Sequence, residues 1–138
     1  NLINKNIVAQ LQSLGVQAMG LSGADANLIK AHKRNHVSID YGFVGDLDEN
    51  SVSSTTLDNL LKAGLTPVLC AITHDGDTQL LNTNADTIAS AVAVAMSSRY
   101  ETQLVYCFEK KGNSNQQFVV EFEIFVPVFF SSFNNKIF

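Results

Sequence analysis

The sequence predicts an α/β fold, organised as a three-layer αβα sandwich with a mainly parallel central sheet. Apolar runs of strand length alternate with segments of helical periodicity along the 138 residues. The connections from helices to the strands that follow them are only a few residues long, which suits parallel strands with helices on the faces of the sheet. The length corresponds to a single domain.

The N-terminal segment predicts a helix that Asn4 caps and Gly15 ends. Four apolar residues follow helical spacing along it: Ile7, Val8, Leu11 and Leu14. Residues 16–22 are short and apolar, so we expect a strand there. Gly23 and Asp25 come next, and we expect a tight turn in which Gly23 adopts a positive φ.

The middle of the chain predicts two short strands and a second helix. The strands are expected at 28–31 and 37–44, on either side of the polar, basic stretch 32–36. The Ser/Thr-rich segment 51–56 leads into a helix that Gly64 ends. The apolar residues of this helix are Leu57, Leu60 and Leu61.

Four more elements complete the prediction. A buried strand is expected at 67–72, and the Asp-Gly pair within 74–77 predicts a hairpin turn. A helix is expected at 84–96, followed by a strand at 103–108. One side of the helix carries the residues Ala85, Ile88, Ala89, Val92 and Met96.

The composition argues against several classes of partner. The net charge is −4 at pH 7 and no basic run occurs, so the chain lacks the electrostatic signature of nucleic-acid binding. No apolar stretch reaches the length of a membrane span, and we expect no membrane partner. Cys70 and Cys107 lie in apolar runs, which favours buried free thiols in a reducing compartment.

Three polar residues stand close together where the predicted hairpin meets the third helix: Asn82, Asn84 and Asp86. A structural role explains two of them, because Asn84 suits a helix N-cap and Asp86 in the first turn complements the helix dipole. Asn82 adds a second amide at the end of a strand, which is where ligands bind in open α/β sheets. The run is therefore the main candidate for a binding site.

Other residue patterns fail as sites. His32 and His36 stand four apart in a polar loop with no third ligand at useful spacing, so we expect no metal there. The segment 46–57 begins like a calcium loop but has Ser51 and Leu57 where glycine and glutamate are needed. No phosphate-binding glycine loop that ends in Gly-Lys-Ser/Thr occurs.

Three blocks resemble the acetylglutamate kinases of the amino-acid kinase family. They read Leu-Ser-Gly-Ala-Asp-Ala-Asn-Leu at 21–28, Asp-Tyr-Gly-Phe-Val-Gly-Asp at 40–46 and Gln-Leu-Leu-Asn-Thr-Asn-Ala-Asp at 79–86. The last contains the family's Asn-x-Asn-Ala-Asp signature. Their order and approximate spacing match the family across most of residues 3–112, which corresponds to a central piece of the enzyme.

The resemblance implies a cytoplasmic, homo-oligomeric enzyme of arginine biosynthesis with the carbamate kinase-like fold. Its reaction is phosphoryl transfer from ATP, bound with Mg²⁺, to the γ-carboxylate of N-acetyl-L-glutamate. Asn82 and Asn84 match substrate-binding positions, and Asp86 matches the aspartate that organises two catalytic lysines. Glu109 and Gly112 match the loop that reaches the ATP phosphates, although the family usually has aspartate where Glu109 stands.

No residue of the sequence matches the two catalytic lysines, so we expect the chain alone to be inactive. Two alternatives remain: another kinase of the family, acting on glutamate, aspartate or UMP, or a non-catalytic small-molecule-binding module of the same fold. Residues 1–112 are interpreted as a partial kinase domain. Residues 113–138 hold seven of the nine phenylalanines and lack the resemblance, so we interpret them as a frame-shifted or mis-joined end, the alternative being a true terminal strand.

Overall fold

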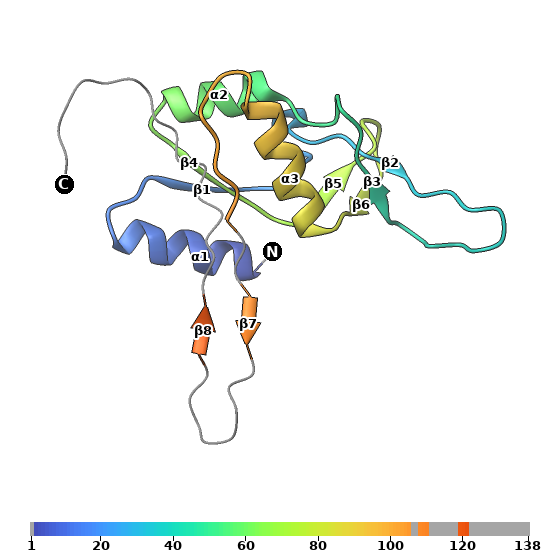
Figure 1. The fold of residues 1–138 in the computed structure, drawn as a ribbon, viewed down its shortest axis with the longest axis horizontal. Helices are drawn as coiled ribbons and strands as arrows, with labels where there is room; N and C mark the ends of the chain where they lie inside the picture. Colours follow the sequence, from blue (N-terminus) through green and yellow to red (C-terminus); the bar gives the residue numbers. More distant parts are fainter. Residues whose placement is uncertain (1, 106–107, 111–118, 122–138) are drawn as a thin grey trace.

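The computed structural model describes residues 2–105, 108–110 and 119–121, and the fold is of the predicted α/β class (Figure 1). The helices are α1 (Leu2–Ser13), the 3₁₀ turn η1 (Asp25–Asn27), α2 (Ser54–Lys62) and α3 (Ala85–Met96). The strands are β1 (Ala18–Leu21), β2 (His32–Lys33), β3 (Gly45–Asp46), β4 (Thr66–Leu69), β5 (Ile72–His74), β6 (Leu80–Asn82), β7 (Phe108–Lys110) and β8 (Val119–Glu121).

Strands β1 and β4 form the parallel pair at the centre of the described fold. Leu21 lies beside Leu69 in their register, and both side chains pack against the core that α2 and α3 form. Helix α1 contacts both strands from the other side (Figure 1). Strands β2–β3, β5–β6 and β7–β8 pair antiparallel, so one of the four described pairs shows the expected parallel arrangement.

The hydrophobic core lies between α2, α3 and the segment that follows η1. Its buried members are Leu28, Ile29, Leu57, Ile88, Val92 and Met96. The periodicity of α2 and α3 is thus confirmed, and each helix has a serine or asparagine cap, at Ser53 and Asn84 respectively. Gly64 follows α2 with a φ of +77°, as the end signal predicted.

Helix α1 differs from its prediction in two respects. It begins at Leu2, so Asn4 lies inside the helix and the predicted cap is wrong. The buried amide of Asn4 instead donates to the carbonyl of Val68 at 2.8 Å. Ile7 and Leu14 of the predicted apolar face are exposed, and Val8 and Leu11 are half-buried. The side chains of Lys5 and Gln12 also donate to carbonyls of β1.

The region between η1 and α2 contains the largest error of the strand prediction. Residues 37–43 form an irregular loop, and the pairing occurs instead between β2 and β3, with isolated bridges at Ile29, Lys30 and Val44. The loop is stabilised by an Asx turn, in which the Gly42 N–H donates to the Asp40 carboxylate at 2.9 Å. No described strand pairs with residues 37–43, and Val37 is fully exposed.

The Asp-Gly hairpin is confirmed, because β5 and β6 pair across a turn in which Gly76 has a φ of +90°. The strand expected at 67–72 divides into β4 and the start of β5. The strand expected at 103–108 is wrong for residues 103–105, which are irregular, while Phe108 begins β7. Apart from β8, the predicted tail 113–138 lies outside the described residues.

The buried carboxylate of Asp58 joins α2 to the segment that follows α3. Asp58 accepts hydrogen bonds from Lys62 at 2.8 Å, from Arg99 at 3.3 Å and from the hydroxyl of Tyr100. The hydrogen bond from Lys62, followed by that from Tyr100, lowers the pKa of Asp58 below its usual range. The ionised carboxylate therefore stabilises the junction between the two helices.

We expect this stabilisation to disappear in acid. A carboxyl group with a lowered pKa in the folded state stabilises the fold above its unfolded pKa, near 4, and the effect is lost as the pH falls through the folded value. The Asp58→Asn variant should unfold at a lower urea concentration than the parent at pH 7, and the difference should shrink steadily below about pH 4. If the difference between the unfolding midpoints of the variant and the parent stayed constant down to pH 2, the charge of Asp58 would not be the source of the stabilisation.

Candidate functional site

The candidate run lies where β6 passes into α3. The N–H of Asn82 donates to the carbonyl of Phe43 at 2.8 Å, which ties the end of β6 to the segment before β3. Asn82, Asn84 and Asp86 are exposed, whereas Thr83 between the asparagines is buried. This alternation is that of an extended chain, whose successive side chains point to opposite faces. The two asparagines therefore share the outer face of the junction.

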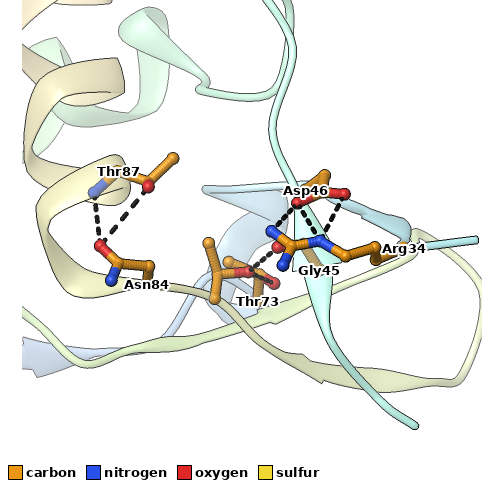
Figure 2. Close-up of polar contacts among 7 residues, drawn as sticks. Arg34, Gly45, Asp46, Thr73, Asn84 and Thr87 are labelled. Atoms are coloured by element: carbon orange, nitrogen blue, oxygen red, sulfur yellow. Dashed lines mark hydrogen bonds and ion pairs between the residues drawn. The ribbon is translucent and has the colours of Figure 1, made fainter. Parts of the chain in front are cut away.

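The structural role expected for Asn84 is present in the fold. Its side-chain oxygen accepts from the N–H of Thr87 at 3.1 Å and lies 3.4 Å from the Thr87 hydroxyl (Figure 2). Asp86 occupies the first turn of α3, where a negative charge complements the helix dipole. Within the described part of the chain, the side-chain amide of Asn82 makes no hydrogen bond, so this polar group is free to meet a ligand.

An ion pair lies beside the run on the neighbouring hairpin. Arg34 Nε donates to both carboxylate oxygens of Asp46 at 3.0 Å (Figure 2). The guanidinium of Arg34 also lies 5.5 Å from the ring centre of Tyr41. The hydrogen bond from Arg34 lowers the pKa of Asp46. Val44 bridges Asn82 in parallel, so alternation places Asp46 on the same face as the asparagines. By the same alternation, this face carries Asp46, Asn82 and Asn84 together with the apolar Val44 and the exposed Leu80.

The inner face of the same strands holds a hydroxyl pair that sequence reasoning missed. Thr73 Oγ1 lies 2.8 Å from Thr83 Oγ1, and Thr83 Oγ1 donates to the carbonyl of Gly45 at 3.1 Å. Thr73 is fully buried and Thr83 is 2% exposed. Threonines in strands are ordinary β-formers, so no local pattern distinguishes these two; the only signal is that Thr83 alternates with two asparagines.

The block at 22–25 is a turn, but not for the predicted reason. The Asp25 carboxylate accepts from the N–H of Ser22 at 2.6 Å and from its hydroxyl at 2.8 Å, and these bonds lower the pKa of Asp25. Positive φ occurs at Ala26 and Asn27, not at Gly23. Gly23 is required by space instead, since a Cβ there would lie 2.6 Å from the carbonyl oxygen of Ile29.

A hollow of about 320 Å³ lies at the carboxyl ends of β1 and β4, where ligands of open α/β sheets bind. Its lining residues are Lys5, Gly20, Leu21, Ser22, Asp25, Cys70, Ile72 and Leu80. Asn82, Asn84 and Asp86 do not line the hollow, whereas Leu80, in the same strand as Asn82, does.

The structure describes only some of the remaining predicted residues. Glu109 lies in β7 opposite Val120, while Gly112 and Cys107 lie outside the described residues; Cys70 is a half-buried free thiol. In the described ranges no group of three or more His, Cys, Asp or Glu side chains is arranged to hold a metal ion. None of the helices described is long and apolar enough to cross a membrane.

Comparison with known proteins identifies a family and several relatives. A model of the amino acid kinase family matches residues 2–106. The acetylglutamate kinase of Bacteroides fragilis is 55% identical over 111 residues, which cover 80% of this chain and 42% of the relative. That of Bacteroides thetaiotaomicron is 53% identical with the same coverage, and that of Myxococcus xanthus is 40% identical over 70% of this chain and 34% of its own. The chain thus spans about two fifths of the Bacteroides relatives' length.

Proposed function

The chain belongs to the amino acid kinase family, and from that premise we propose that it forms part of an acetylglutamate kinase. The proposed reaction transfers the γ-phosphoryl group of ATP to the γ-carboxylate of N-acetyl-L-glutamate. The observation that carries the proposal is the exposure of Asn82, Asn84 and Asp86 at a strand-to-helix junction, in a chain 55% identical to an acetylglutamate kinase over 111 residues.

The run offers suitable groups for an acylated amino acid. The free amide of Asn82 can donate to a carboxylate and accept from the N–H of an acyl amide. Asn84 uses its oxygen as the helix cap, which leaves its NH₂ group as a donor on the same face. We propose that both asparagines bind N-acetyl-L-glutamate.

Asp86 has a different role in the proposal. Phosphoryl transfer requires little covalent chemistry from the protein, and positioning with charge neutralisation dominates. A carboxylate beside a phosphoryl group repels it, so Asp86 would act by orienting cations. In the family pattern, these cations are two lysines, which lie outside the stretch that this chain matches. The exposed position of Asp86 in the first turn of α3 leaves its carboxylate accessible to such partners.

The nucleotide would bind with Mg²⁺, which neutralises phosphate charge during the transfer. Glu109 and Gly112 are the residues that we propose for contacts with ATP. For the whole enzyme we propose the three-layer αβα sandwich and a cytoplasmic homo-oligomer. The positions of α1 and α2 on opposite sides of the β1–β4 pair support the sandwich. The exposed apolar side chains of Leu2 and Ile3 in α1, and of Leu14 directly after it, support further contacts with protein.

The proposal is tested with a chimera in which residues 2–106 replace the aligned residues of the Bacteroides fragilis relative. We expect the chimera to phosphorylate N-acetyl-L-glutamate in preference to L-glutamate, L-aspartate or UMP, as measured by ADP release with each acceptor. An inactive but folded chimera, or a preference for another acceptor, would overturn the proposed function.

Within this chimera, we expect Asn82→Ala to raise KM for N-acetyl-L-glutamate about tenfold, with a smaller change in kcat, because one hydrogen bond to the bound substrate is lost. Asn59→Ala makes the same chemical change at an exposed position of α2 and should leave both constants within about twofold. Equal effects of the two substitutions would remove Asn82 from the site.

A further inference from the structure

We propose that the buried Thr83 is a positioning residue, whose hydroxyl fixes the orientation of Asn82 and Asn84 through the carbonyl of Gly45 and the hydroxyl of Thr73. The identity of the substrate rests on the proposed function, whereas the positioning itself rests on the geometry of the β3, β5 and β6 strands. Thr73 lies in β5, Gly45 lies in β3 and Thr83 directly follows β6, so the hydroxyl of Thr83 links the candidate run to both neighbouring segments.

The number of available protons determines the direction of the hydrogen bonds. The two hydroxyls have one proton each and face three contacts: 2.8 Å between them, 3.1 Å to the Gly45 carbonyl and 3.3 Å to the Leu81 carbonyl. The two shorter contacts are satisfied together when Thr73 donates to Thr83 and Thr83 donates to Gly45. The geometry therefore favours a directed chain of hydrogen bonds from Thr73 in β5, through Thr83 at the end of β6, to Gly45 in β3.

The backbone around Thr83 is held on both sides as well. The N–H of Asn82 donates to Phe43 at 2.8 Å, and the N–H of Thr83 donates to Ala71 at 3.1 Å. These bonds fix two successive peptide groups. The buried side chain of Thr83 fixes which face of this extended segment points toward the interior. Because side chains alternate along an extended chain, an inward Thr83 requires the side chains of Asn82 and Asn84 to point outward.

Gly45 permits the close approach that this arrangement needs. A Cβ at this position would lie 2.7 Å from the Thr83 hydroxyl and 3.0 Å from the Cβ atoms of Ala31 and Leu81. Any other residue would push β3 away from β6 and lengthen the bond from Thr83. The absence of a side chain at Gly45 is thus part of the same arrangement.

The test compares Thr83→Val, which keeps the shape and removes the hydroxyl, with Thr83→Ser, which keeps the hydroxyl. Val92→Ala is the control, because it removes packing from the buried face of α3 without touching the hydroxyl chain. In the 138-residue chain, NMR would follow amide exchange at the N–H of Asn82 and the side-chain NH₂ signals of Asn82 and Asn84.

We expect Thr83→Val to accelerate exchange at Asn82 about tenfold and to shift both NH₂ signals, and we expect Thr83→Ser to restore them. Val92→Ala should leave the NH₂ signals of Asn82 and Asn84 unchanged, even if it lowers the melting temperature as much as Thr83→Val does. The positioning role is overturned if Thr83→Val leaves those signals unchanged, or if the loss of packing at Val92 shifts them equally.

A second readout connects the positioning to substrate. In the active chimera, Thr83→Val should raise KM for N-acetyl-L-glutamate at least about fivefold with kcat nearly unchanged, and Thr83→Ser should restore KM. An unchanged KM in an active chimera would overturn the positioning role while the proposed function stands. A parent chimera without activity would count against the proposed function alone, and the NMR comparison would still decide the role of Thr83.

Discussion

Replacing Gly23 with alanine is expected to destabilise the 138-residue chain by about 3 kcal/mol, at the upper end of the range for overpacking. A Cβ at this position would lie 2.6 Å from the carbonyl oxygen of Ile29 and 2.9 Å from the Cα of Thr73. Both are backbone atoms of segments that meet in the core, so neither can move aside by a side-chain rotation. Urea unfolding followed by circular dichroism measures the change.

Gly42→Ala is the matched control. Gly42 has a φ of +67°, and a Cβ added there would meet no atom within 4 Å beyond the neighbouring residues. Alanine at this position therefore introduces conformational strain of about 1 kcal/mol but no collision. If Gly23→Ala lowers the free energy of unfolding no more than Gly42→Ala does, the backbone near Gly23 is packed less closely than the structure shows.

In the chimera that carries residues 2–106, Asp86→Asn is expected to lower kcat about 100-fold, a change typical of losing one preorganised electrostatic group. Asparagine keeps the size of the side chain and its place in the first turn of α3, but it removes the charge that would orient the lysines. KM for N-acetyl-L-glutamate should change much less, since the substrate contacts are assigned to the asparagines. Steady-state ADP release measures both constants.

Asp77→Asn provides the comparison for this substitution. Asp77 is an exposed carboxylate on the β5–β6 turn, and its neutralisation should alter kcat by less than about twofold. A chimera in which Asp86→Asn retains most of its activity would remove Asp86 from catalysis and leave it as a residue that favours the start of α3.

The elements with strong local signals were predictable from sequence. Helices α2 and α3 combine apolar periodicity with serine and asparagine caps, and the Asp-Gly pair specifies the β5–β6 turn. The pairing of β2 with β3 was not predictable, because two-residue strands are selected by tertiary contacts, here the hydrogen bonds from Arg34 to Asp46 across the hairpin. The alternating apolar residues at 37–43 imitate a strand without a described partner.

Some features of the candidate site were also predictable from sequence, and others were not. The cap at Asn84 and the first-turn position of Asp86 follow from local rules, and the structure shows both. Thr73 and Thr83 come together only because β5 and β6 pair, and Gly45 reaches them from a strand that is remote in sequence. Buried polar contacts of this kind depend on several chain segments at once, so a single sequence does not reveal them.

The attachment of α1 has a calorimetric consequence. The helix bonds strand carbonyls through Asn4, Lys5 and Gln12, while Ile7 and Leu14 remain exposed. The heat capacity of unfolding rises with the apolar surface that becomes hydrated, and polar surface lowers it. Detachment of α1, whose Val8 and Leu11 are only half-buried, would therefore add less to the heat-capacity increment than unfolding of the buried core between α2 and α3.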